Sequence, residues 1–185
     1  MNKGKIIFVI LGAALLIEII YAVWVLNTPA PVPPPETVSL PKTVSLSLYS
    51  PRSEFKKGEV VSVTVNLDTG THETEGADLL LSFDPKVLEA TAGAVLKGVI
   101  YPEYPQTRID QKTGSIAISG ISGLIGKTFQ GSGVFATVNF KAKAVGQATL
   151  SIKFTPGQTN DSNVVEALSG NDILENVSDL TLTLQ

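Results

Sequence analysis

Apolar and polar residues alternate one by one along most of the chain after residue 43. The clearest run is VSVTVNL at residues 61–67, and similar runs begin near residues 44, 79, 116, 134, 150 and 180. A period of two places successive side chains on opposite faces of a β-strand, so one face of each such strand can be buried. With turn residues between the runs, the pattern predicts an all-β fold over residues 43–185. We expect a two-sheet antiparallel jelly-roll β-sandwich.

The stretch Ala77–Ala90, ADLLLSFDPKVLEA, combines a strand with the turn that ends it. Its first half alternates, so Leu79, Leu81 and Phe83 are predicted to face the core. Asp84-Pro85 then ends the strand, because proline has no N–H for a neighbouring strand and Asp suits the cap of the following turn. The two apolar residues that follow would return to the same core, as at the corner of a sandwich.

The first 42 residues follow a different pattern. Residues 1–5 are short and basic, residues 6–26 are apolar apart from Glu18, and residues 27–42 are rich in proline. A run of about 21 apolar residues is long enough to cross a hydrocarbon layer of about 30 Å. Lysines before that run predict a cytoplasmic N-terminus. The pattern therefore predicts one N-terminal transmembrane helix, a stiff extended linker, and an extracytoplasmic sandwich.

A cleaved signal peptide is the alternative for residues 6–26, although this apolar run exceeds the usual 7–15 residues. We favour an uncleaved anchor. Glu18 lies within the apolar run and has three interpretations. It can be a protonated side chain that the apolar surroundings tolerate, a contact to a partner helix, or, since Leu16-Ile17-Glu18 is similar to type IV pilins, part of a processing site.

Charge argues against a nucleic-acid partner. Without residues 1–26 the chain carries a net charge of about −4 and has no basic run, whereas nucleic-acid binding needs clustered Lys and Arg. Cysteine is absent, which excludes disulfides and thiolate metal sites.

Catalytic motifs are missing as well. The single histidine, His72, lies in a polar run that reads as a loop, and no nucleophile elbow, P-loop, zinc-protease or dinucleotide motif is present. We therefore expect a protein that is not an enzyme and needs no cofactor. The one alternative is Ca²⁺, which takes six to eight oxygen ligands. Those ligands would come from the segment 160–163 and from Asp172, namely Asn160, Asp161, Ser162, Asn163 and Asp172, although such clusters usually form Asx turns.

Aromatic residues are few outside the apolar segment. Tyr101 and Tyr104, in the sequence YPEYP, form the one aromatic cluster, and Phe135 can face outward on its strand. Tyr101 and Tyr104 could form a platform for a sugar ring, or the loop could cap an edge of the core. The first interpretation predicts a carbohydrate-binding module for a polysaccharide.

Three stretches resemble the cohesin family, whose members are β-sandwich modules that bind dockerin-bearing proteins. They are LLLSFDPKVLEA (Leu79–Ala90), GSIAISG (Gly114–Gly120) and GSGVFATVNFKAKAVGQATL (Gly131–Leu150). The resemblance covers residues 44–185. It implies a flat sheet face that binds a dockerin-type partner, with the strand 77–83 on that face and the strands 107–111, 115–119 and 149–154 beside it.

Asp78 falls where cohesins commonly use a polar side chain to hydrogen-bond a dockerin helix. Alternation independently turns Asp78, Leu80 and Ser82 away from the core. The residues that this resemblance and alternation together assign to the protein-binding face are Asp78, Leu80, Ser82, Arg108, Asp110, Ala117, Ser119, Ser151 and Lys153. The leading hypothesis is a membrane-anchored, cell-surface module that binds a dockerin-type or other extracellular protein. Polysaccharide binding and a structural role in the cell envelope are the alternatives.

Overall fold

The structure is a computed structural model that describes residues 15–18, 20, 21, 23, 43–123 and 127–185. The chain divides into two units, Met1–Ser39 and Leu40–Gln185. In the first unit the described residues are helical and exposed. Among the described residues, no helix combines the length and apolar character needed to span a membrane. The predicted linker, 27–42, and most of the predicted transmembrane segment, 6–26, lie outside the described residues.

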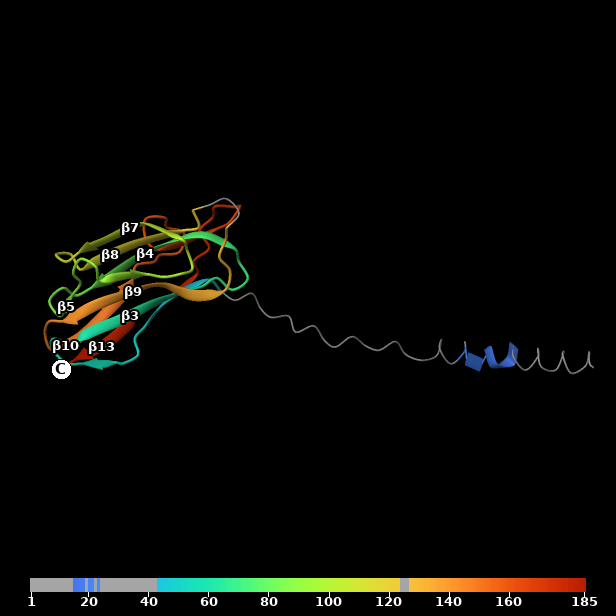
Figure 1. The fold of residues 1–185 in the computed structure, drawn as a ribbon, viewed down its shortest axis with the longest axis horizontal. Coiled ribbons are helices and arrows are strands. Elements are labelled where there is room, and N and C mark those ends of the chain that lie inside the picture. The colour runs from blue at the N-terminus through green and yellow to red at the C-terminus, as the bar shows by residue number, and fades with distance from the viewer. Residues whose placement is uncertain (1–14, 19, 22, 24–42, 124–126) are drawn as a thin grey trace, which may run out of the picture. The chain divides into compact units, whose positions relative to one another are not determined.

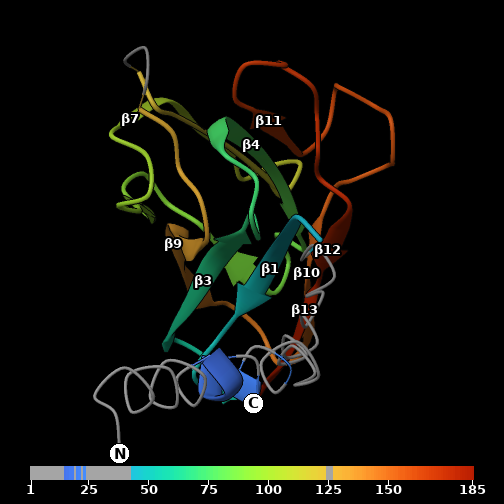
Figure 2. The ribbon, with the colours of Figure 1, turned by 90° about the vertical axis from the view of Figure 1, so that its right-hand side faces the viewer.

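In the second unit the described residues form two sheets that pack face to face (Figures 1 and 2). Sheet 1 contains β1 (Ser45–Tyr49), β3 (Val60–Asp68), β5 (Leu88–Glu89), β6 (Val95–Lys97), β9 (Ser132–Ala142) and β12 (Asn176–Ser178). Sheet 2 contains β2 (Glu54–Phe55), β4 (Thr74–Phe83), β7 (Glu103–Asp110), β8 (Ser115–Ile121), β10 (Gly146–Ile152), β11 (Asn163–Glu166) and β13 (Leu180–Leu184). The all-β sandwich predicted for residues 43–185 is confirmed.

The strand order is β12-β1-β3-β9-β5 in sheet 1, with β6 also paired to β9, and β2-β13-β10-β4-β8-β7 in sheet 2, with β11 also paired to β4. Two edge pairs, β1–β12 and β13–β2, are parallel. The prediction of a purely antiparallel sandwich is therefore wrong at these edges. Only strands joined by a hairpin must run antiparallel, and neither of these pairs is so joined, since the chain visits other strands in between.

The core lies between the sheets, and alternation places its members. Three of the inward residues of β3 and β4, Val63, Leu79 and Leu81, are at most 1% exposed. After β4, the carboxylate of Asp84 accepts the Lys86 N–H at 2.8 Å, and its carbonyl accepts the Leu88 N–H at 3.0 Å. Leu88 is completely buried. The predicted corner is thus confirmed, and it carries the chain from sheet 2 to sheet 1.

Strand β9 departs from simple alternation. Val65 of β3 pairs with Ala136, whereas the next residue, Asn66, pairs with Val134, so Phe135 is an extra residue in β9. Such a β-bulge shifts the inward and outward positions by one. Phe135 is therefore completely buried and Val134 is 37% exposed. The expectation that Phe135 can face outward is wrong, because a period of two cannot foresee a bulge.

Candidate functional site

The outward face of β4, β8 and β7 presents three cross-strand rows of side chains. The middle row is Leu80, Ala117 and Arg108. One row beside it is Asp78, Ser119 and Gln106, and the other is Ser82, Ser115 and Asp110. We call these nine residues the docking face. A short apolar centre, Leu80 and Ala117, therefore lies between two polar rows, with a guanidinium group at the β7 end.

Side chains on β4 and β8 are half-buried, whereas Arg108 is exposed at the β7 edge. The inward neighbours Leu79, Leu81 and Ile118 are buried, which fixes the outward direction of Asp78, Leu80 and Ser119. Asp78 therefore lies outside the core, as predicted. Leu80 also points away from the core, as predicted, and is half-buried because it lies in the middle of the sheet.

At Leu80 the strand that pairs with this edge of β4 changes from β10 to β11. Leu81 pairs with Ile152 of β10, whereas Asp78 pairs with Asn163 of β11. At the junction the Leu80 carbonyl accepts the Lys153 N–H at 2.8 Å, and the Ser162 hydroxyl accepts the Leu80 N–H at 2.8 Å. Because its backbone is held from both strands, the Leu80 side chain has a fixed position at the centre of the docking face.

Asp110 adds a negative charge at one corner of the docking face. Its carboxylate accepts the Thr113 N–H at 3.2 Å and the Lys112 N–H at 2.9 Å within the turn that joins β7 to β8. These hydrogen bonds, that of Thr113 foremost, together with the Arg108 charge, hold the pKa of Asp110 below its ordinary value. Gly114 completes the turn with a φ of 67°, in the left-handed region that glycine adopts without steric cost.

The structure brings all nine residues predicted for the protein-binding site onto the outward side of sheet 2. Seven of them belong to the docking face as defined here, and Ser151 and Lys153 lie beyond β4, where Ser151 pairs with Ser82. Sequence analysis missed Gln106 and Ser115. Extending the alternation of β7 and β8 by two residues would have found both of them. That the nine predicted residues bind a protein stays a prediction.

The prediction of a sugar platform at Tyr101 and Tyr104 is wrong, since these side chains are only 2% and 8% exposed. Tyr101 shares a 2.7 Å hydrogen bond with the buried Thr74 hydroxyl, and the Tyr104 hydroxyl donates to the Phe135 carbonyl of sheet 1. Both rings also pack against the Phe135 ring at centroid distances of 6.2 and 5.5 Å. Burial raises the pKa of each tyrosine to about 12. The YPEYP segment therefore ties the sheets together.

The oxygens considered for Ca²⁺ mostly serve the backbone. Asp172 accepts the N–H groups of Val164 and Leu174, both at 3.0 Å, and Asp161 accepts the Thr155 N–H at 2.6 Å. Two buried oxygens, Asp161 Oδ1 and Asn163 Oδ1, accept no hydrogen bond among the described residues. Two oxygens fall well short of the six to eight that Ca²⁺ takes. No group of three or more His, Asp or Glu that could hold a metal occurs among the described residues.

His72 pairs with Glu166 at 3.1 Å between the ring Nδ1 and the carboxylate Oε1. Glu166 also accepts the Ser169 hydroxyl at 2.7 Å. The Ser169 hydrogen bond, and then the one to His72, lower the pKa of Glu166. The contact joins the loop before β4 to the last residue of β11. His72 therefore links two segments of the fold, and its neighbours are not those of a histidine that activates a nucleophile.

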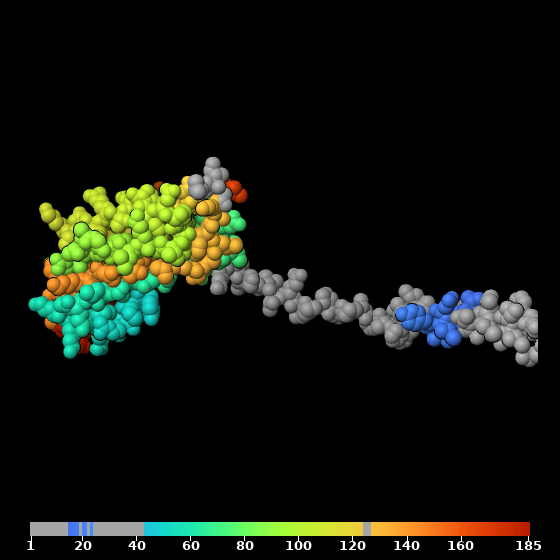
Figure 3. Space-filling model, viewed as in Figure 1, coloured from blue at the N-terminus to red at the C-terminus, as the bar shows by residue number. Residues whose placement is uncertain are grey.

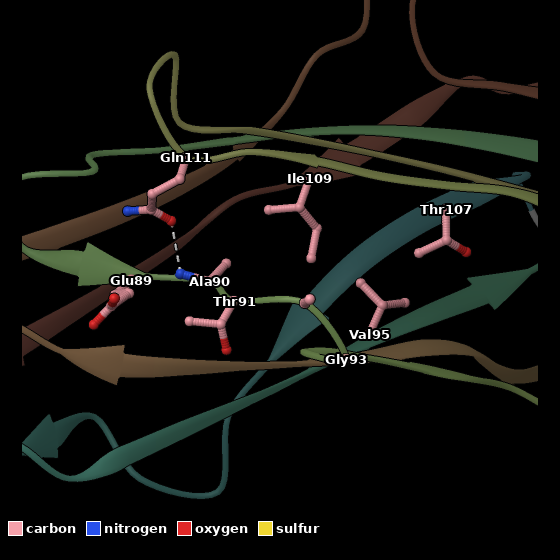
Figure 4. A pocket seen from close by; sticks show the side chains of 9 residues that line it. Glu89, Ala90, Thr91, Gly93, Val95, Thr107, Ile109 and Gln111 are labelled. Atoms are coloured by element: carbon pink, nitrogen blue, oxygen red, sulfur yellow. Dashed lines mark hydrogen bonds between the residues drawn. The ribbon is translucent and has the colours of Figure 1, made fainter.

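A pocket of about 590 Å³ opens where the edges of the two sheets meet, between the β5–β6 segment and β7. Figure 4 shows Ile109 and Val95 from the two sides of this opening, and the Gln111 side chain reaching the Ala90 backbone. Gln111 accepts the Ala90 N–H at 2.8 Å and donates to the Leu88 carbonyl at 3.1 Å. The side-chain amide thus fastens one sheet to the other. Figure 3 shows the yellow-green residues that include β7 above the brighter green residues that precede them in the sequence, with the orange residues that include β9 beneath these.

Comparison with known proteins gives a consistent picture of the fold. A family model described as the Cohesin domain matches residues 44–173. A type II cohesin domain from the cellulosome of Acetivibrio cellulolyticus has 19% identity and a TM-score of 0.63, and the match covers 76% of this chain and 95% of that one. No curated protein sequence matches the chain.

Two further solved structures are similar. The sixth cohesin from scaffoldin B of Acetivibrio cellulolyticus, in complex with a mutant dockerin, has 20% identity and a TM-score of 0.63, with 78% of this chain and 100% of that chain covered. A non-cellulosomal cohesin from the archaeon Archaeoglobus fulgidus has 16% identity and a TM-score of 0.58, with 78% and 92% covered. At such identities the solved structures establish the shared fold alone.

Proposed function

The chain belongs to the cohesin family, and from that premise we propose that its sandwich binds a dockerin-type protein partner through the docking face. One similar cohesin was solved with a dockerin bound, which supports a partner of this class. The observation that carries the proposal is the Leu80–Ala117 centre between two polar rows. A few apolar anchors surrounded by polar groups provide most of the binding energy in protein interfaces.

The charges of the face fit a polar helix surface better than a pocket ligand. Asp78 and Asp110 are acceptors at opposite sides of the apolar centre, and Arg108 is an exposed donor at one end of it. Because these groups lie on adjacent strands of one sheet, they can be contacted together without any movement of the backbone. A preorganised face of this kind lowers the entropic cost of association.

We further propose that residues 6–26 anchor the protein in a membrane, with the sandwich outside. The apolar run of about 21 residues and the two lysines before it support this placement. The full chain should stay with the membrane fraction during alkaline carbonate extraction, and a chain that starts at residue 43 should not. Release of the full chain into the supernatant would contradict the anchor.

The test of the docking face uses a panel of immobilised recombinant dockerin domains and residues 43–185 as the analyte. At least one dockerin should bind, and the double variant Asp78→Ala/Leu80→Ala should weaken that binding by about 30-fold or more. The matched control is Ser47→Ala/Thr64→Ala on the outward face of sheet 1, which should change affinity less than twofold. Equal binding by both double variants would contradict the proposal, provided that thermal melts show both folded.

A further inference from the structure

A second recess lies at one end of the docking face, over Gly76 of β4. Gly76 is two residues before Asp78, so it faces the same outward side one step along the strand. It pairs with Ile121 of β8 on one side and with Val165 of β11 on the other. Because glycine has no side chain, these two neighbours become the walls of an open pocket of about 590 Å³.

The turn after β11 supplies the outer wall of this pocket through Ala167 and Leu168. Leu168 is fully exposed and is the one described residue other than glycine with a positive φ, at 71°. A left-handed backbone is sterically unfavourable for leucine. An exposed aliphatic side chain on such a backbone adds little to the stability of the fold, and it is available for a contact outside this chain.

The turn is held in place rather than left loose. The Ala167 N–H donates to the Glu73 carbonyl at 2.9 Å, and the Gly170 N–H donates to the Glu166 carbonyl at 3.0 Å. The Glu166 side chain bonds both Ser169 and His72. These contacts hold the turn that carries Leu168 beside the residues at the start of β4.

The rim of the pocket is acidic. Glu73 and Glu75 line it, Glu103 is paired next to Ile121, and Lys127 is the one basic group among its described lining residues. Apolar walls with an acidic rim are complementary to an aliphatic side chain that has Lys or Arg beside it. The volume is that of several side chains, so it suits one turn of a helix.

We propose that this pocket, formed by Gly76, Ile121, Val165, Ala167 and Leu168, is a specificity site that receives one helical turn of the bound dockerin, with an aliphatic residue inside and a Lys or Arg at the acidic rim. The proposal rests on the proposed function, since the pocket opens on the same side of sheet 2 as the docking face. The docking face provides the central contact, and the pocket selects among partners by what their helix carries at this end.

The central variant is Leu168→Asn, because asparagine tolerates a left-handed backbone. The dockerin that binds most tightly in the panel should lose about tenfold in affinity, while the melting temperature stays equal or rises by about 1–2 °C. Leu168→Met should keep affinity within about threefold. Leu96→Asn, at a 53% exposed leucine of sheet 1, is the matched control and should change affinity less than twofold.

The acidic rim is tested by the salt dependence of the same complex. Between 50 and 500 mM NaCl the affinity of Glu75→Gln should fall less than that of the wild type, because the variant lacks one electrostatic attraction that salt can screen. If Leu168→Asn binds like the wild type while Asp78→Ala/Leu80→Ala binds weakly, the pocket proposal is wrong and the docking face stands. If the tightest dockerin binds Leu168→Asn weakly but Asp78→Ala/Leu80→Ala normally, the docking face is wrong instead. If no dockerin of the panel binds, both proposals fail.

Discussion

The outward faces of the two sheets share one core and the same alternation, yet they carry different chemistry. The face of sheet 2 has an apolar centre at Leu80 and Ala117, with charged groups around it. The face of sheet 1 has uncharged Ser, Thr and Asn along its middle, such as Ser47 with Asn66, and Ser62 with Asn139, and charged residues such as Asp68 and Lys141 lie at the two ends of β3. Alternation makes both faces solvent-accessible. It is the placing of an apolar anchor among charges that distinguishes a binding surface from a merely solvated one.

Tyr49 is a 57% exposed ring on sheet 1 that pairs with Thr64, and the other exposed apolar residues of that sheet, Val60, Leu96 and Val134, also pair with polar residues. Tyr49 lies at the end of the short β1, and its cross-strand neighbours are hydroxyl groups, so it has no apolar residue to extend it into an anchor. Leu80 differs because Ala117 continues its apolar surface onto the next strand. The comparison therefore depends on pairs of residues across strands, which the linear sequence shows only after the register is known.

The largest effect on stability is expected from a substitution in the core, which lies beneath both outward faces. Leu81 is completely buried, and Leu81→Ala should lower the free energy of unfolding by about 2–5 kcal/mol. Leu80→Ala, one residue away but outward, should cost less than about 1.5 kcal/mol, because the Leu80 side chain is already partly exposed to solvent. Urea denaturation of both variants measures the difference. Equal losses would show that the inward and outward sides of β4 have been assigned wrongly.

Much of this arrangement could be predicted from the sequence, and the reasons for the failures are physical. Alternation alone oriented β4 correctly, because one face of that strand is covered by sheet 1 and the other is not. It failed at Phe135, where a bulge changes the register, and at Tyr101 and Tyr104, where burial depends on contacts with a strand thirty residues away. The pocket at Leu168 could not be predicted either, since its walls come from three separate strands and a turn.

The second-largest effect is expected at one end of the sandwich, where Tyr101 and Tyr104 link sheet 2 to sheet 1. Both have a pKa raised from 10 to about 12, chiefly by burial. A group whose folded pKa is raised contributes stability that is complete below the unfolded pKa and is lost as the pH rises through the folded value. The protein should therefore lose stability between pH 10 and pH 12, by about 2–3 kcal/mol for one such tyrosine.

Tyr101→Phe distinguishes this cause from general alkaline unfolding. At pH 7 it should be slightly less stable than the wild type, by about 1 kcal/mol, because the Thr74 hydroxyl loses its hydrogen bond with Tyr101 and keeps the one to the Phe129 carbonyl. Between pH 10 and pH 12 its stability should fall less steeply, since one of the two ionisations is absent. Chemical denaturation at a series of pH values provides the measurement. Parallel curves for the two proteins would assign the alkaline loss to other groups.

The smallest effect compares one carboxylate on each side of the sandwich. Asp68 of sheet 1 and Asp110 of sheet 2 each accept a backbone N–H in a turn, from Gly70 and from Lys112 respectively, both at 2.9 Å. Asp110 accepts a second one from Thr113, and its pKa is lowered by that bond first of all. Stability from a lowered carboxylate pKa is present above the unfolded pKa and is lost as the pH falls through the folded value. Since Asp110 is open to solvent, the effect is small.

Asp110→Asn should therefore lower the melting temperature by no more than about 2 °C at pH 7, and its melting temperature should fall less than that of the wild type between pH 5 and pH 2.5. Asp68→Asn is the matched control, with a single N–H contact at the other face. Thermal melts at five or six pH values give the comparison. A wild-type and an Asp110→Asn profile that run parallel in acid would show that the Thr113 and Lys112 contacts do not favour the ionised carboxylate. Asp110 would still be ionised at neutral pH, so the negative charge would stay at this corner of the docking face, but the turn would add nothing to its stability.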